Sequence, residues 1–122
     1  MGHYAMDIDG SIAAAPQQMQ ELASSLMAAG HRVSVVTGTG DDTVTQQEWD
    51  AKANYLNSLG MGQSYGTLTV ISNSVSGGLP AAKAQWCVDN GVDCLIDNSK
   101  ENAKAAVDAG VDLVMVPWAS RV

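Results

Sequence analysis

Apolar runs rich in β-branched residues alternate regularly with segments of helical periodicity along these 122 residues. A helix between two strands returns the chain to the same direction, so this alternation favours a parallel sheet with helices on both faces. The sequence therefore predicts an α/β fold, a three-layer, doubly wound, Rossmann-like sheet of five parallel strands. The predicted strands are residues 3–6, 32–37, 67–71, 93–96 and 111–116, and the predicted helices are residues 16–29, 45–59, 80–89 and 100–109.

Length and charge limit what such a domain does. We expect residues 1–122 to form a single domain. The formal net charge of −7, with only six Lys and Arg, argues against an extended nucleic-acid groove and against binding to an anionic membrane. No apolar run approaches the roughly 18 residues of a membrane span, and the N-terminus lacks a signal pattern. We therefore expect a cytoplasmic protein.

The segment Asp7-Ile8-Asp9-Gly10 sets two carboxylates beside a turn glycine, directly after the first predicted strand. Alternation along a strand would project Asp7 and Asp9 to the same side. Carboxylates this close repel each other unless a cation or a shared proton intervenes, so the pair indicates a Mg²⁺ site. An acidic turn that caps a helix is the alternative interpretation.

Other polar residues are expected at the same edge of the sheet, because the carboxyl ends of parallel strands lie together and bind ligands there. Carboxylates hold Mg²⁺, whereas a hydroxyl and an ammonium donate to phosphate oxygens. Singly, each of these residues also has a structural explanation, such as a helix cap or a solvated lysine. The residues that follow the later strands, or lie early in the next helix, are Thr37, Ser72, Asn73, Lys83, Asp97 and Asn98.

The order of these residues resembles the haloacid dehalogenase (HAD) phosphohydrolase superfamily, over about Ala5 to Val116. The four segments that carry the resemblance are Asp7-Ile8-Asp9-Gly10-Ser11, Val35-Val36-Thr37-Gly38, Lys83, and the run from Leu95 to Asn102. The chain has no segment long enough for a cap domain, so the resemblance implies a minimal, capless HAD-like member.

The resemblance implies a Mg²⁺-dependent phosphomonoester hydrolase that forms an aspartyl-phosphate intermediate. Asp7 would be the nucleophile and Asp9 the general acid and base. Thr37, Gly38 and Lys83 would bind the phosphoryl group. Asp7, Asp97 and the backbone carbonyl of Asp9 would hold Mg²⁺.

Several points stay open at this stage. Asn98 stands where many members carry a second acidic residue, so Glu101 is an alternative support for the metal. The expected substrate is phosphorylated: a small molecule, a nucleotide or a nucleic-acid end. The oligomeric state is undetermined. His3 and His31 have no obvious partners, and we expect surface or strand-edge roles for them.

Two other functions compete with hydrolysis. A response-regulator receiver also uses Asp, Thr, Lys and Mg²⁺, but its phosphoacceptor Asp would end the third strand, where this chain has Ile71-Ser72-Asn73. The stronger alternative is a HAD-like domain that binds a partner or a phosphorylated ligand without turnover.

Overall fold

The computed structural model describes residues 1–39, 43–73 and 75–117, and these residues include the predicted parallel sheet of five strands. The strands lie in the order β3-β2-β1-β4-β5, so the fold class predicted from the sequence is confirmed. The strands are β1 (His3–Met6), β2 (Arg32–Gly38), β3 (Thr67–Ile71), β4 (Cys94–Ile96) and β5 (Leu113–Met115). The helices are α1 (Pro16–Ala28), α2 (Gln46–Ser58), α3 (Gly78–Asp89) and α4 (Lys100–Ala109), and a wide turn, η1 (Ile8–Ile12), follows β1.

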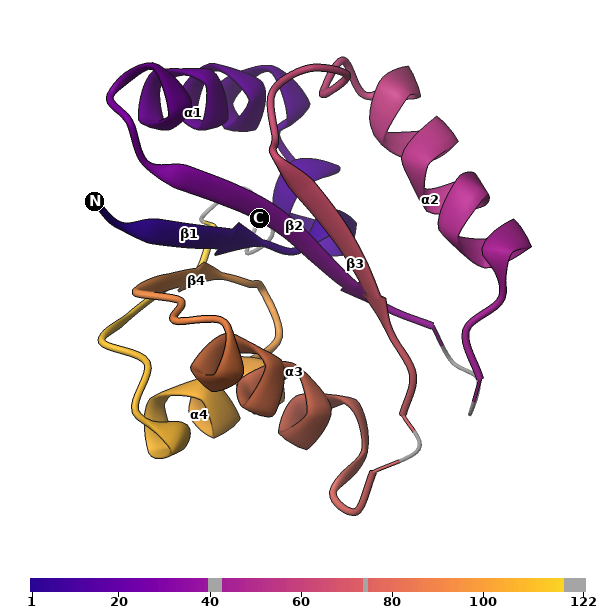
Figure 1. Ribbon diagram of the computed structural model, residues 1–122, viewed down its shortest axis with the longest axis vertical. Helices are drawn as coiled ribbons and strands as arrows, with labels where there is room; N and C mark the ends of the chain where they lie inside the picture. The colour runs from indigo at the N-terminus through magenta and orange to yellow at the C-terminus, as the bar shows by residue number, and fades with distance from the viewer. Residues whose placement is uncertain (40–42, 74, 118–122) are drawn as a thin grey trace.

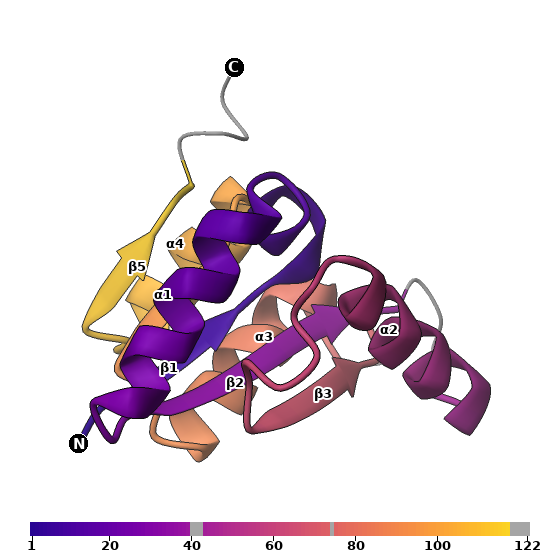
Figure 2. The same cartoon turned by 90° about the horizontal axis from the view of Figure 1, so that it is seen from above.

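The helices cover both faces of the sheet (Figure 1). Helices α1 and α2 lie on one face, and α3 and α4 lie on the other. Alternation along the strands supplies a separate core to each face: Met6 and Val35 pack towards α1 and α2, whereas Ala5 and Val36 pack towards α3 and α4. β3 and β5 form the two edges of the sheet (Figure 2).

Local signals set most of the element boundaries. The Thr45 hydroxyl accepts a hydrogen bond from the Glu48 backbone N–H at 3.1 Å, which is half of the predicted capping box. Pro80 lies in the first turn of α3, where its missing N–H is not needed. The last strand is shorter than predicted because the Val111 N–H bonds back to the Ala106 carbonyl and so closes the end of α4.

The strand order places the topological switch point between β1 and β4, because the chain builds outward in opposite directions from these two strands. The Asp7 N–H donates to the Ile96 carbonyl at 2.9 Å, and the Asp97 N–H donates to the Met115 carbonyl at 3.0 Å. Hydrogen bonding thus continues one residue past each strand. Asp7 and Asp97 therefore leave the sheet side by side at its carboxyl edge.

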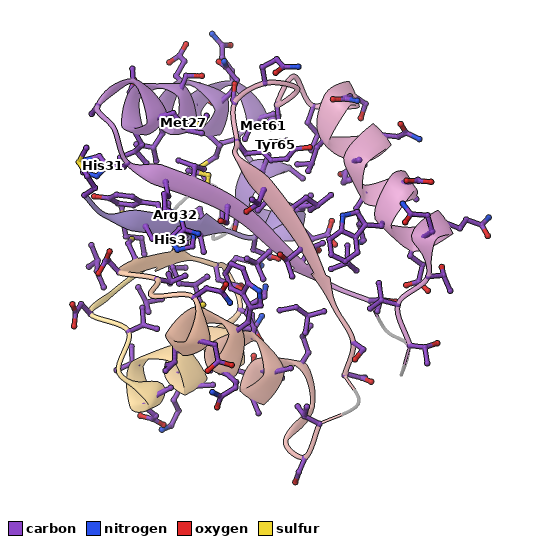
Figure 3. The ribbon with its side chains drawn as sticks, in the orientation of Figure 1. His3, Met27, His31, Arg32, Met61 and Tyr65 are labelled. Carbon is purple, nitrogen blue, oxygen red and sulfur yellow. The ribbon has the colours of Figure 1, made fainter. Side chains whose placement is uncertain are left out.

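His3 lies near the amino end of the sheet and is buried, with 3% of its surface exposed. Its Nε2 pairs with the Ser34 hydroxyl at 2.6 Å and its Nδ1 with the Asn90 carbonyl at 2.9 Å. His31 lies just before β2 and accepts from the Gly2 N–H at 2.9 Å (Figure 3). The expectation that His3 has no partner was wrong, because its partners come from residues remote in the sequence.

None of the helices within the described ranges combines the length and the apolar character needed to cross a membrane.

Candidate functional site at the carboxyl edge

The η1 turn positions the first carboxylate. The Ile12 N–H donates to the Asp7 carbonyl and the Ala13 N–H donates to the Ile8 carbonyl, so both hydrogen bonds span five residues. Ile8 and Ile12 are fully buried and anchor the turn in the core. Because the strand ends at Met6, the alternation predicted for the two aspartates does not continue. Asp7 is 8% exposed and buried, whereas Asp9 is exposed.

A buried lysine lies between two carboxylates. The Lys83 Nζ from α3 is 3.0 Å from Asp7 Oδ1 and 2.8 Å from Asp97 Oδ2. Lys83 is 1% exposed and Asp97 is fully buried. This charge cluster (Asp7, Lys83 and Asp97) brings together three of the predicted site residues from distant parts of the sequence.

Helix α4 supports the third member of the cluster. The backbone N–H of Ser99 donates to Asp97 Oδ1 at 2.9 Å, and the Asn102 side-chain amide donates to Asp97 Oδ2 at 3.1 Å. Ser99 also caps α4, because its hydroxyl accepts from the Asn102 N–H. Sequence analysis included Asn102 in the fourth segment of the resemblance but gave it no role. The only signal of its role is this capping relation, which places its side chain in the first turn of the helix.

The surroundings of the cluster favour the charged form of Lys83 and disfavour the charged form of Asp7. Burial disfavours charged Lys83, but the charges of Asp7 and Asp97 outweigh burial and raise the pKa of Lys83 above its ordinary 10.5. Burial raises the pKa of Asp7 from 3.8 to about 6 and the charge of Asp97 adds to the rise, although Lys83 opposes it. One ammonium thus faces two carboxylates and does not fully compensate both.

The other predicted site residues do not join the charge cluster. Thr37 is buried one residue before the end of β2, and among the described residues no hydrogen bond links it to the cluster. A Cβ at the adjacent Gly38 would collide with the side chain of Leu79, so α3 covers that glycine closely. Glu101 is exposed and accepts a hydrogen bond from the Ser99 hydroxyl at 3.2 Å.

The loop after β4 packs against the η1 turn. Gly10 has φ +72°, and a Cβ built there would overlap the side chain of Asn98. Asn98 therefore has a packing role between the two chain segments that carry Asp7 and Asp97.

The substitution Gly10→Ala is expected to destabilise the protein by about 2–3 kcal/mol, since it combines a left-handed backbone with an overlap. Gly60→Ala is the matched control, because Gly60 has φ +85° but no atom within 4 Å of the added Cβ. Urea denaturation measures both, and the control should lose only about 1–2 kcal/mol. Equal losses of stability in the two variants would mean that the Asn98 side chain moves away from the added methyl group at no cost in free energy.

Across residues 1–39, 43–73 and 75–117, no group of three or more His, Cys, Asp or Glu side chains is placed to hold a metal ion. The serine that follows Gly10 adds an unusual feature. Among the described residues, the Ser11 hydroxyl is the one buried side-chain polar atom without a hydrogen-bond partner.

Comparisons with known proteins identify the fold. A universal stress protein family member from Burkholderia pseudomallei has TM-score 0.63 and 12% identity, covering 95% of both chains. A universal stress protein from Archaeoglobus fulgidus has TM-score 0.63 and 11% identity, covering 95% of this chain and 93% of that one. A universal stress protein in complex with cAMP has TM-score 0.60 and 11% identity, covering 95% of both chains. No family model matches the sequence, and no curated protein matches it either.

These similar structures overturn the resemblance to HAD phosphohydrolases. They are universal stress proteins, so the assignment to the HAD superfamily was wrong, and with it the predicted Mg²⁺-dependent phosphomonoester hydrolase and its aspartyl-phosphate intermediate. The physical reason is that polar residues after successive strands gather at one edge in any doubly wound sheet. The order of these residues along the chain therefore indicates the fold class more than it indicates the reaction or ligand of the protein.

Proposed function

We propose that this protein binds a phosphorylated small molecule, in particular a nucleotide, at the carboxyl edge of its sheet and releases it unchanged. The observation that carries the proposal is the buried charge cluster beside the switch point between β1 and β4. Open α/β sheets bind ligands outside the carboxyl ends of their strands at such a point. The cluster therefore lies where this kind of fold binds ligands.

The charge of the cluster indicates that a phosphate would need a cation in order to bind there. Two carboxylates and one ammonium carry a net charge of −1 when all are ionised. A phosphate brought to this edge would be repelled unless a cation came with it. We propose Mg²⁺ for this role, because it prefers hard oxygen ligands.

The oxygens present suit Mg²⁺. The carboxylates of Asp7 and Asp97, with the backbone carbonyl of Asp9, would hold the ion, and water and the phosphate would complete its coordination. When bound, the ion would supply the positive charge that a phosphate requires. Lys83 would share the two carboxylates with it and donate to the phosphate.

Binding without turnover is supported by the positions of the acidic side chains. Asp7 accepts a hydrogen bond from the Lys83 ammonium, which reduces its nucleophilicity. The Asp9 side chain is exposed, and within the part of the chain that the structure describes no hydrogen bond or ion pair joins it to the cluster. Asp97 already accepts three hydrogen bonds, from Lys83, Ser99 and Asn102, so it does not serve as a proton shuttle.

The nature of the ligand is supported by one of the similar structures, a universal stress protein in complex with cAMP. A nucleotide combines a phosphate with an extended planar group, and both can be varied independently in a test.

Isothermal titration calorimetry with cAMP, AMP, ATP and ribose 5-phosphate tests the proposal, with Mg²⁺ or with chelator. Phosphate release is measured in the same samples. We expect at least one nucleotide to bind with Mg²⁺, at least tenfold more weakly with chelator, and with no phosphate released.

The matched variants are Asp7→Asn, which should abolish the effect of Mg²⁺, and Asp112→Asn, an exposed aspartate whose substitution should leave binding unchanged. Absence of binding across the panel would overturn the proposed function. Release of phosphate that depends on Asp7 would overturn binding without turnover.

A further inference from the structure

A cavity of about 260 Å³ opens at the amino end of the sheet, between the end of α1 and the first residues of β2 and β3. Figure 3 shows Met27, His31 and Arg32 together at this end. The volume is slightly below the roughly 300–1,000 Å³ of drug-sized sites, so the cavity suits a small ligand. The lining residues that bear on its chemistry are Met27, His31, Arg32, Val33, Ser34 and Thr67.

The lining of this cavity carries a positive charge. Arg32 is exposed at the first position of β2, and within the part of the chain that the structure describes no hydrogen bond or ion pair engages its guanidinium. None of the described lining residues is acidic. Asp93, at the same end of the sheet, accepts the His3 N–H at 2.8 Å and does not line the cavity. An unpaired guanidinium in such a cavity favours an anionic ligand.

His31 adds a hydrogen-bond donor beside Arg32. The His31 Nδ1 accepts the Gly2 N–H at 2.9 Å, so the neutral imidazole carries its proton on Nε2. The ring packs edge-on against Tyr4, with 5.4 Å between the ring centroids, and this contact restricts its orientation. Among the described residues Nε2 has no hydrogen-bond partner, so its N–H is available to a ligand.

The two hydroxyl groups of the lining use their protons within the protein. The His3 Nδ1 faces the Asn90 carbonyl, which only accepts, so in the neutral ring Nε2 accepts from the Ser34 hydroxyl at 2.6 Å. Ser34 in turn accepts from the Thr67 hydroxyl at 2.8 Å. Neither hydroxyl is therefore free to donate to an anion in the cavity.

The anion that fits these groups carries a single charge and an apolar body. One guanidinium compensates one carboxylate, whose two oxygens match its paired N–H donors. A phosphate dianion would keep an uncompensated charge. Met27 and Val33 offer an apolar wall to an aliphatic chain. The cavity beside Trp86, between α3 and β3, differs because its described lining includes Asp89 and no cation.

We propose that the cavity at the amino end of the sheet binds a small aliphatic monocarboxylate. The carboxylate pairs with Arg32 and accepts from His31 Nε2, and the alkyl chain packs on Met27 and Val33. Because the strands are parallel, this site and the charge cluster lie at opposite ends of the sheet. The inference therefore goes beyond the proposed nucleotide binding and does not depend on it.

A nuclear magnetic resonance titration of the ¹⁵N-labelled protein with butyrate at pH 7 tests the proposal. Butanol is the neutral probe with the same alkyl chain length, and inorganic phosphate is the anion without an alkyl chain. We expect saturable shifts of the His31 and Thr67 backbone amides with butyrate and none with butanol or phosphate.

Arg32→Gln should weaken butyrate about tenfold, in line with the loss of a hydrogen bond between charged groups. Met27→Glu should abolish butyrate binding, because it places a competing carboxylate in the lining. Lys100→Gln is the matched control and should leave the affinity unchanged. Lys100 is likewise exposed at the first position of its element, α4, and does not line the cavity.

Three results would overturn the proposal. Butanol could shift the same amides as strongly as butyrate, or phosphate could bind there as tightly as butyrate. Arg32→Gln could also bind butyrate as tightly as the wild type, or lose no more affinity than Lys100→Gln. The last result would mean that butyrate responds to the overall charge of the protein and not to this cavity.

Discussion

Lys83→Met is expected to destabilise the folded protein by about 3–5 kcal/mol at neutral pH, the usual effect of removing one partner from a buried ion pair. Methionine keeps most of the side-chain volume but leaves the carboxylates of Asp7 and Asp97 facing each other with no cation between them. Urea denaturation of the wild-type and variant proteins measures the loss. The loss should shrink as the pH falls below about 6, where Asp7 takes up a proton and no longer repels Asp97.

Lys104→Met is the matched control for that experiment. Lys104 also pairs with an aspartate, at 2.7 Å from Asp108, but both side chains are exposed to solvent. Its loss should change the free energy of unfolding little, because water and salt screen an exposed pair. A similar loss from both lysines would contradict the buried cluster, and so would a Lys83→Met protein as stable as the wild type.

Asp7→Asn is expected to stabilise the protein by about 1–3 kcal/mol at pH 7. Burial raises the pKa of Asp7 from 3.8 to about 6, so the folded state binds a proton more tightly than the unfolded state does. The contribution of Asp7 to stability is therefore most favourable below about pH 4 and declines as the pH rises to about 6. Asparagine is neutral at every pH and removes that decline.

Thermal denaturation between pH 4 and pH 7 measures the difference between the wild type and Asp7→Asn. The two unfolding free energies should converge towards pH 4 and separate towards pH 7. Asp112→Asn, at an exposed position, should show no such divergence. A variant that is less stable than the wild type at pH 7 would mean that the ion pair with Lys83 outweighs the burial of Asp7.

A stabilising substitution at a functional residue has a clear interpretation. The folded protein retains a carboxylate that is only partly compensated, and the same substitution should abolish the effect of Mg²⁺ on ligand binding. Residues that act on a ligand are often suboptimal for stability. Stability and binding should therefore change in opposite directions in Asp7→Asn.

The sequence alone was sufficient for the secondary structure and the fold class. Pro16 begins α1, Thr45 caps α2 and Gly110 follows the last residue of α4, and each signal acts within a few residues along the chain. Strand and helix periodicities are likewise local, so they can be recognised in the sequence without knowledge of the tertiary contacts. Their alternation then leaves few topologies other than a doubly wound parallel sheet.

The sequence also indicated that Asp7, Lys83 and Asp97 belong to one site, because each follows a strand or begins the next helix. The chemistry predicted for these residues from the sequence was wrong. The motif order matched HAD phosphohydrolases, whereas the similar solved structures are universal stress proteins. Short polar motifs at the carboxyl edge are shared by many functions of one fold class, so they do not identify one of them.

Only the tertiary structure decided which groups touch. The hydrogen bond between Lys83 and Asp7 joins residues 76 positions apart, and no local pattern encodes it. Three other features likewise depend on how η1, α4 and α3 pack against the sheet. They are the exposure of Asp9, the hydrogen bond from Asn102 to Asp97, and the cavity beside Trp86. Local propensity determines the elements of this protein, whereas long-range packing determines the charges and cavities that a ligand meets.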